Sequence, residues 1–298
     1  MKEEMEMFLP LQDLLLEEEN KEQGQEEKHY PLQELIPNDQ ENKENEHDEN
    51  SNRVKAIEEI IGYEFHDPIL LQQVFTHHSY DKGLSSSFER LAYVGDSVLN
   101  FLITKEHYFS YPDKDPGKLT RLRAVNVDTE KLARVALKYQ LHKFLRHKII
   151  SLSEQIKEFT NAIVEYPLHS SGLIDAPKVL ADIVESLVGA IFTDSNSMDT
   201  TWKIVKNLLE PMIIPDALPT HPITQLRELC QRKKFSVKIR DFWKETGEIE
   251  IVVDEYFVGR AKYSAKRSVA RNRAALDAYY QIVEMYGLKK LVPEKLIT

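Results

Sequence analysis

Three acidic side chains interrupt helical runs that are otherwise apolar, and their positions suggest a metal site. Asp96 interrupts an apolar run that begins at Leu91 and has the spacing of a helix. Asp182 and Glu185 interrupt a second apolar run, over residues 179–192, and their separation of three places them on one helix face. A buried carboxylate without a partner costs several kcal/mol, so each needs a cation, a donor or solvent. The two runs therefore predict a metal ion between two helices.

Single acids on helices are usually just solvated, and only the combination of three favours a site. His77 and His78, which precede the first acidic run, are further candidate ligands. A histidine in a polar turn more commonly makes a structural hydrogen bond, so both roles stay open for this pair.

The length and composition leave room for two domains. The chain has 298 residues, and its single cysteine, Cys230, excludes an internal disulfide bond. It shows no secretory signal pattern and no apolar stretch of the ~20 residues that a membrane helix needs. We therefore expect a soluble intracellular protein without a membrane partner, in the nucleus, the cytoplasm or both.

The charge is distributed unevenly along the chain. Residues 1–50 carry 4 Lys and no Arg against 17 Asp or Glu, a net charge of −13, whereas the remainder carries 35 basic and 32 acidic residues, a net of +3. The acidic segment lacks the apolar surface that would offset chain entropy, so we expect residues 1–50 to be a disordered tail. Its two similar Pro-Leu-Gln segments, at residues 10–15 and 31–36, are either a chance similarity or a pair of short binding motifs.

An ordered body begins near Arg53. Residues 54–61 are amphipathic, and the pair Asp67-Pro68 predicts a helix that Asp67 caps and Pro68 opens. Further helical patterns continue to a last one over residues 202–213, and the prolines that follow indicate a stiff linker over residues 214–221.

A group of basic residues lies between the two acidic runs. Such side chains usually solvate the outer faces of helices, but as a group they could also line a phosphate track. The group consists of Arg121, Arg123, Lys131, Arg134, Lys138, Lys143, Arg146 and Lys148.

From residue 222 onward the pattern changes to one helix, three strands and another helix. Residues 223–233 are amphipathic, and three segments, 236–243, 248–255 and 257–263, alternate as strands do. The last helix is expected over residues 266–285. Its start lies within residues 259–273, which include six basic residues and no acidic residue. The start of a helix already favours phosphate, so this cluster suits an RNA backbone.

Five motifs follow one another in the helical body. They are Gly-Tyr-x-Phe-x-Asp-Pro-x-Leu-Leu, Thr-His-x-Ser, Glu-Arg-Leu-x-x-x-Gly-Asp-Ser-Val-Leu, Leu-Thr-x-Leu-Arg-Ala and Lys-x-x-Ala-Asp-x-x-Glu-x-x-x-Gly-Ala. In this order they resemble the ribonuclease III domain, over about residues 54–212. The resemblance is strongest to the plant ribonuclease-three-like proteins, which add a double-stranded-RNA-binding domain. It implies a mostly α protein: an all-helical endonuclease domain over residues 53–213, then a small α+β module.

The resemblance also implies an activity. Such domains hydrolyse double-stranded RNA with Mg²⁺, for which Mn²⁺ is an alternative, as homodimers, and leave 5′-phosphate and 3′-hydroxyl ends with short 3′ overhangs. It places Asp96, Asp182 and Glu185 on the metal, with Asp96, Glu185 and Glu89 as catalytic candidates. Carboxylate oxygens are ligands that Mg²⁺ prefers, and a divalent cation polarises a phosphoryl oxygen and lowers the pKa of water.

The chain departs from the family at Ala92, where a glutamate one turn before the aspartate is usual. Glu89 lies seven residues before Asp96, on nearly the same helix face but about 10 Å along the axis. It is therefore a candidate ligand through water or a second metal. Two functions stay open: a Mg²⁺-dependent endoribonuclease of RNA processing or small-RNA pathways, and a weak or inactive regulator that binds double-stranded RNA.

Residues 222–287 carry a second resemblance, to the double-stranded-RNA-binding domain. Its Lys-Lys-x-Ala-Lys motif is matched by Arg-Ser-Val-Ala-Arg, with Ser268 at the middle basic position. Domains of this kind recognise the shape of A-form RNA. The resemblance implies RNA contacts from both helices, through Thr224, Gln225, Glu228, Lys266, Arg267 and Arg271.

Cys230 lies in the first helix of this module, close in sequence to several basic residues. Basic neighbours can lower the pKa of a thiol, which makes Cys230 a candidate redox target; an inert packing role is the alternative.

Overall fold

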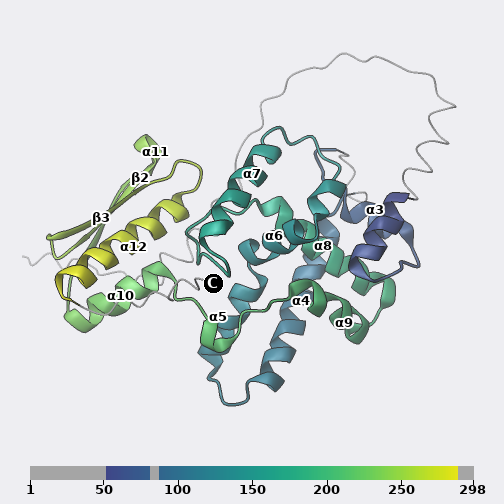
Figure 1. Ribbon diagram of the computed structural model, residues 1–298, viewed down its shortest axis with the longest axis horizontal. Coiled ribbons are helices and arrows are strands. Elements are labelled where there is room, and N and C mark those ends of the chain that lie inside the picture. The colour runs from purple at the N-terminus through teal and green to yellow at the C-terminus, as the bar shows by residue number, and fades with distance from the viewer. Residues whose placement is uncertain (1–51, 81–86, 288–298) are drawn as a thin grey trace, which may run out of the picture. The chain divides into compact units, whose positions relative to one another are not determined.

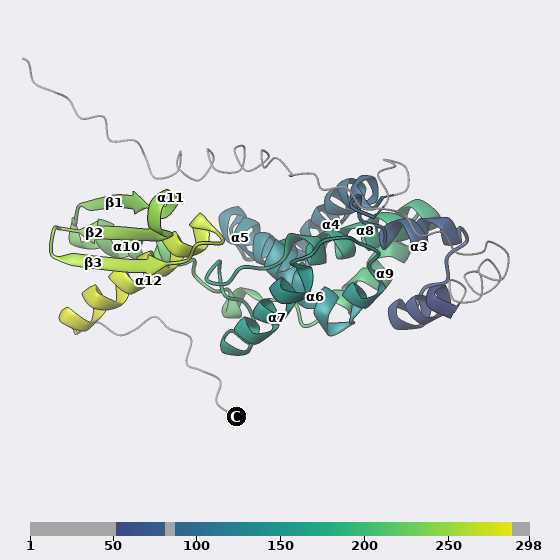
Figure 2. The ribbon, with the colours of Figure 1, turned by 90° about the horizontal axis from the view of Figure 1, so that it is seen from above.

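The computed structural model describes residues 52–80 and 87–287, and Figures 1 and 2 show them from two directions. The predictions for residues 1–50, disorder and two binding motifs, lie outside this part of the chain. None of the described helices is both long and apolar enough to cross a membrane.

The first part of the described chain is built from helices. The predicted cap at Asp67 is present, because its side chain accepts a hydrogen bond from the Ile69 amide with Pro68 in the first turn. A helix over residues 52–61 comes first. It is followed by α3 (Pro68–Val74), α4 (Glu89–Ser110), α5 (Pro116–Val127), α6 (Thr129–Lys138), α7 (Leu152–Ala162), α8 (Lys178–Ser195) and α9 (Met198–Leu209).

The helix α9 lies four residues earlier than the sequence predicted. It begins at Met198 because the Ser197 side chain accepts a hydrogen bond from the Thr200 amide, an N-cap that the apolar pattern does not show. It ends at Leu209 because Glu210 precedes a proline, and a residue in that position avoids the helical conformation.

The core of the helical domain is organised around α8. Buried residues occur all around this helix, which packs against α3, α4, α6 and α9 (Figures 1 and 2). A helix that is apolar on every side must be enclosed by its neighbours. The acids of α8 therefore lie at the edge of a large hydrophobic core, and the neighbours of α8 decide what those acids face.

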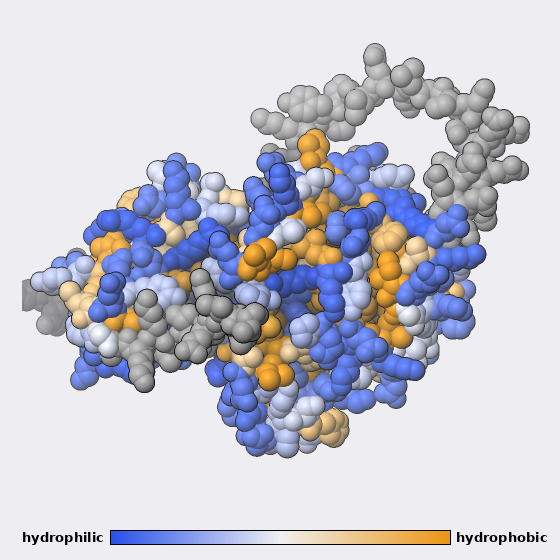
Figure 3. Space-filling view, in the orientation of Figure 1, coloured by the Kyte–Doolittle hydropathy of each residue, from blue (hydrophilic) through white to orange (hydrophobic). Residues whose placement is uncertain are grey.

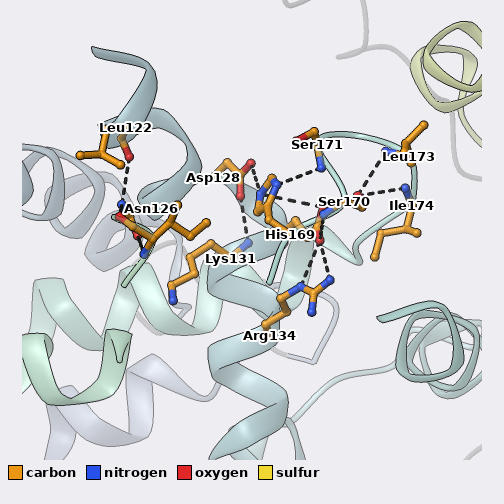
Figure 4. A network of polar contacts seen from close by, with 12 residues as sticks. Leu122, Asn126, Asp128, Lys131, Arg134, His169, Ser170, Ser171, Leu173 and Ile174 are labelled. Carbon is orange, nitrogen blue, oxygen red and sulfur yellow. Dashed lines mark hydrogen bonds and ion pairs between the residues drawn. The ribbon is translucent and has the colours of Figure 1, made fainter. Parts of the chain in front are cut away.

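A buried polar network leads the chain into α8 (Figure 4). The carboxylate of Glu130 on α6 accepts hydrogen bonds from Arg134 and from the amide of Ser170. The His169 ring lies 2.8 Å from Asp128. These contacts hold residues 169–170, which precede α8 in the chain, against the start of α6.

Four of the basic residues grouped between the acidic runs serve inside the domain. Lys131 and Lys138 donate to the backbone carbonyls of Pro211 and Glu210. Arg134 pairs with Glu130, and Arg146 donates to the side chain of Thr76. Lys131, Arg134 and Arg146 are buried or half-buried and have partners in the folded chain, so neither the solvated faces nor the phosphate track expected for this group describes these three. Lys138 is exposed, as expected for a solvated face.

Lys131 provides a test of this internal role. Burial lowers the pKa of its ammonium group to about 8. We expect Lys131→Met to raise the free energy of unfolding at pH 7 by about 2 kcal/mol, because no charge is then desolvated. Between pH 8 and about 10.4 the folded native protein binds fewer protons than the unfolded chain, so its stability rises with pH and the advantage of methionine shrinks.

Denaturant unfolding at pH 7 and pH 10 measures both effects. Lys138→Met is the matched control, because Lys138 makes the same kind of bond from an exposed position; its effect should stay within about 0.5 kcal/mol. A loss of stability in Lys131→Met at pH 7 would show that the bond to Pro211 outweighs the cost of desolvation.

The C-terminal module has the predicted α-β-β-β-α order. It consists of α10 (Pro222–Lys233), β1 (Val237–Phe242), β2 (Glu248–Val253), β3 (Phe257–Lys262) and α12 (Arg267–Met285), with the one-turn helix α11 (Trp243–Thr246) between the first two strands. The antiparallel sheet has the order β1-β2-β3. Ile249, Ile251 and Val253 join residues of α10 and α12 in a second hydrophobic core.

The two cores are separate along the chain. The first ends at Leu209 and the second begins at Leu226, and the linker predicted over residues 214–221 lies between them.

Candidate metal and active site

The site is built where α4 and α8 cross with their backbones in contact. A Cβ atom at Gly95 would lie 1.8 Å from the carbonyl oxygen of Glu185, and one at Gly189 would lie 2.0 Å from that of Leu91. Only glycine permits this approach. The crossing places Asp96, next to Gly95, beside the acidic part of α8.

Asp96 is exposed and has a partner on its own helix. The Asn100 amide donates to Oδ1 of Asp96 at 2.8 Å and to its backbone carbonyl at 3.0 Å. Solvent and a donor thus provide what the sequence required for this carboxylate. Asn100 fixes the side chain of Asp96 while leaving its other oxygen available.

Asp182 is paired with the first residue of α8. The Lys178 ammonium lies 3.0 Å and 3.1 Å from the two carboxylate oxygens of Asp182. Burial raises the pKa of Asp182, and the charge of Lys178 acts in the opposite direction. Lys178 therefore opposes the effect of burial on this acid.

Glu185 has the most strongly perturbed carboxyl group of the site. Burial, reinforced by the charges of Asp182 and Asp96, raises its pKa to about 7. Glu185 is thus close enough to the other two carboxylates for their charges to act on it, although Asp96 comes from a helix that is distant in sequence. A metal-free site of this kind is electrostatically unfavourable.

Glu89 flanks the same cluster from the first residue of α4. One carboxylate oxygen lies 2.6 Å from Nδ1 of His78, and the charge of Glu89 contributes to the raised pKa of Asp182. Ala92, where the family has a glutamate, is buried. Glu89 thus lies near the acids without replacing the missing side chain.

The acidic set fits a Mg²⁺ ion in its chemistry. Asp96, Asp182 and Glu185 offer hard oxygen donors, and a divalent cation would offset the burial and the repulsion that together raise the pKa of Glu185. Across the described residues, the only three histidine, cysteine or acidic side chains with ligand atoms within 4.8 Å of one another are His77, His78 and Glu89. The three acids are spaced more widely than this. Two oxygens bound to one Mg²⁺ at about 2.1 Å lie at most about 4.2 Å apart, so in this conformation at least one of the three acids would reach the ion through a water ligand.

Comparison with known proteins gives the family. Residues 89–196 match the ribonuclease III domain. Over 244 residues the chain is 44% identical to ribonuclease 3-like protein 3 of Oryza sativa subsp. japonica, and the match covers 80% of this chain and 82% of that protein. The chain belongs to the ribonuclease III family. As a member of this family it is an endoribonuclease, and the matched segment holds Glu89, Asp96, Asp182 and Glu185.

Other members of the ribonuclease III family match over different shares of their length. Endoribonuclease Dicer homolog 1 of Arabidopsis thaliana is 41% identical over 242 residues, which make up 77% of this chain but only 13% of that protein. The solved nuclease domain of ribonuclease III from Campylobacter jejuni has 26% identity and a TM-score of 0.41, and the match covers 53% of this chain and 97% of that one.

The residues expected to bind RNA in this ribonuclease III family member differ in their exposure to solvent. Thr224, Gln225 and Glu228 lie on the partly exposed side of α10. Lys266 and Arg267 are half-buried at the start of α12, where Arg267 pairs with Asp241. Arg271 is only 7% exposed, which differs from the expectation for a phosphate contact, because its guanidinium group is not on the surface in this conformation.

Cys230 is buried in the core of the C-terminal module. Burial and the nearby charge of Asp254 raise the pKa of its thiol to about 11. A thiol in such a place stays protonated and poorly reactive. The structure thus favours the packing role over the redox role.

Three polar contacts of the acids were not predicted from the sequence, although His78 had been named as a candidate ligand. Asn100 and Lys178 each lie one helical turn from the acid they contact, so the spacing of four residues was an available signal. His78 contacts Glu89 across eleven residues, through a turn whose shape the sequence does not specify.

Proposed function

We propose that this ribonuclease III family member cleaves double-stranded RNA with Mg²⁺ held by Asp96, Asp182 and Glu185, leaving 5′-phosphate and 3′-hydroxyl ends with short 3′ overhangs. The observation that carries the proposal is the convergence of these carboxylates at the glycine crossing of α4 and α8, seen in the pKa of Glu185. RNA processing and small-RNA pathways are the settings that such products suit.

Each residue near the acids has a physical task in this proposal. Asn100 orients Asp96, and Lys178 balances the charge of Asp182 until a cation arrives. Glu185 must lose its proton to bind a cation, so metal affinity falls as the pH drops below about 7. When bound, Mg²⁺ supplies charge stabilisation at the phosphate and lowers the pKa of the attacking water.

RNA binding is proposed for both helices of the C-terminal module. Lys266 and Arg267 lie at the amino-terminal end of α12, where the helix dipole also favours a phosphate. Thr224, Gln225 and Glu228 of α10 offer polar contacts to a minor groove. Because Arg271 is buried, we expect it to contribute less to RNA binding than the other five residues.

An assay with long duplex RNA tests the proposal. Purified full-length protein with Mg²⁺ should shorten the duplex, and the new 5′ ends should accept a label only after phosphatase treatment. The substitution at Ala92 favours a second candidate, a regulator that binds duplex RNA without cutting it. Intact RNA that is retarded in a gel in the presence of Mg²⁺ would support this regulator and reject the nuclease.

A homodimer is proposed on the exposed side of α4. Hydrophobic patches interrupt the polar surface of the molecule in Figure 3, and α4 carries three exposed aromatic residues on one side. Tyr93, Phe101 and Tyr108 are 80%, 53% and 68% exposed. Their spacing places them within an arc of about 80° around the helix, next to Asp96. Burial of this stripe against a second copy would remove apolar surface from water and bring two acidic sites close together.

Charges in the stripe should separate the dimer. We expect Tyr93→Asp combined with Phe101→Asp to weaken self-association at least about 100-fold, because aromatic residues at the centre of an interface each contribute about 2 kcal/mol or more. Sedimentation velocity measures the change. Ile150→Asp is the control, since Ile150 is fully exposed outside α4. A double variant that sediments as a dimer would place the interface elsewhere.

A further inference from the structure

A second set of metal-ligand side chains lies beside the acidic cluster. His77 and His78 follow α3, and Glu89 is the first residue of α4. One ligand atom from each of the three lies within 4.8 Å of the other two, which no other such set achieves in residues 52–80 and 87–287. This geometry is closer to that of a bound ion than the spacing of the acids on α4 and α8.

The pair formed by His78 and Glu89 is open to an incoming ion. Their side chains are 60% and 41% exposed, and His78 Nδ1 lies 2.6 Å from Glu89 Oε1. The other oxygen, Oε2, is buried without a hydrogen-bond partner among the described residues. The Ser87 side chain and the amide of Glu89 itself also act as hydrogen-bond donors to this carboxylate, and a bound cation would add to them.

His77 is held in place by the chain around it. Its Nδ1 lies 2.8 Å from the Ser79 hydroxyl and accepts from the Ser79 amide at 3.0 Å. The ring packs 4.0 Å from that of His78 and edge-on to Phe88. Contacts of this kind orient histidines that bind metals. Coordination through Nε2 requires the proton on Nδ1, so the ring would give up the bond that Nδ1 accepts from the Ser79 amide and donate instead to the Ser79 hydroxyl.

The donor set selects the class of ion. Two imidazole nitrogens and one carboxylate oxygen suit Zn²⁺ and related transition metals, whereas Mg²⁺ prefers oxygen alone. Ligands at about 2.0 Å from a tetrahedral ion lie about 3.3 Å apart. His78 therefore has to move less than about 1 Å away from Glu89, which an exposed side chain can do.

We propose that His77, His78 and Glu89 bind one divalent transition-metal ion, with Zn²⁺ as the best match, in a site separate from the Mg²⁺ site. The ion would tie the segment after α3 to the start of the helix that carries Asp96. It would also neutralise Glu89, whose charge acts on Asp182 in the metal-free protein.

Cobalt provides a spectroscopic probe of the site. Chelator-treated full-length protein should bind one equivalent of Co²⁺ with the visible absorption of a tetrahedral complex, and stoichiometric Zn²⁺ should remove that absorption while excess Mg²⁺ should not. His78→Ala and Glu89→Gln should each weaken Co²⁺ binding by about 100-fold. His66→Ala is the matched control, because His66 pairs with Asp194 at 2.9 Å but has no third ligand.

The acidic variants separate this site from the proposed nuclease site. Asp96→Asn and Glu185→Gln should leave the Co²⁺ absorption unchanged, whatever they do to RNA cleavage. Three outcomes would overturn the proposal: no tetrahedral absorption, equal absorption in His78→Ala, or loss of absorption in the two acidic variants, which would place the ion on α4 and α8.

Discussion

Glu185→Gln is expected to lower the rate of duplex RNA cleavage about 1,000-fold while the protein stays folded. Glutamine keeps the shape of the side chain but removes a charged ligand next to Asp96 and Asp182. The loss of several kcal/mol of charge stabilisation corresponds to a decrease of this size, since each 1.36 kcal/mol is tenfold in rate. Single-turnover cleavage of a labelled duplex at saturating protein measures it.

The same variant should be more stable than the native protein when metal is absent. The pKa of Glu185 is about 7 in the folded protein, above its value of about 4.3 in an unfolded chain. The folded state thus binds more protons between these values, and stability falls as the pH rises through them. At pH 8 glutamine should add about 2 kcal/mol, a figure reduced for the partial exposure of the group.

An exposed acid on another helix supplies the control. Glu154→Gln, on α7, should change neither cleavage nor stability by more than experimental error. Cleavage by Glu185→Gln at the native rate would remove the acidic cluster from the reaction, and a metal-free variant without added stability at pH 8 would contradict the raised pKa.

Gly189→Ala is expected to destabilise the protein by about 4 kcal/mol. In an unstrained helix the change from glycine to alanine is favourable by about 1 kcal/mol. Here the new Cβ would meet the Leu91 carbonyl oxygen at 2.0 Å, and a backbone atom cannot rotate away. The two helices must separate, which opens the core around α8. Urea unfolding followed by circular dichroism gives the change in free energy.

Gly117→Ala tests whether the contact, and not the residue type, causes the loss. Gly117 also lies in a helix, but its Cβ would meet only a side-chain oxygen, that of Asp115, at 3.1 Å. We expect an effect within about 1 kcal/mol. Equal stability of Gly189→Ala and the native protein would mean that α4 and α8 are not in backbone contact at this point.

Much of the fold followed from local signals. The cap at Asp67, the strands of the C-terminal module and the helices that carry the acids were predicted because each depends on residues within a few positions. The shift of α9 shows the limit of such reasoning. Its start depends on the cap at Ser197 and its end on the proline after Glu210. The apolar pattern that suggested residues 202–213 reflects neither of these signals.

The sequence by itself determined which acids share a helix face, that a metal suits them and that two cores follow one another, because these depend on residue type and on the fixed period of a helix. Only the tertiary structure decided what each polar group contacts. It placed Lys131 and Arg271 in the interior, and it brought His78 to Glu89. The reason is physical: burial and pairing depend on segments that are far apart in the chain, and the local pattern of a sequence does not contain those distances.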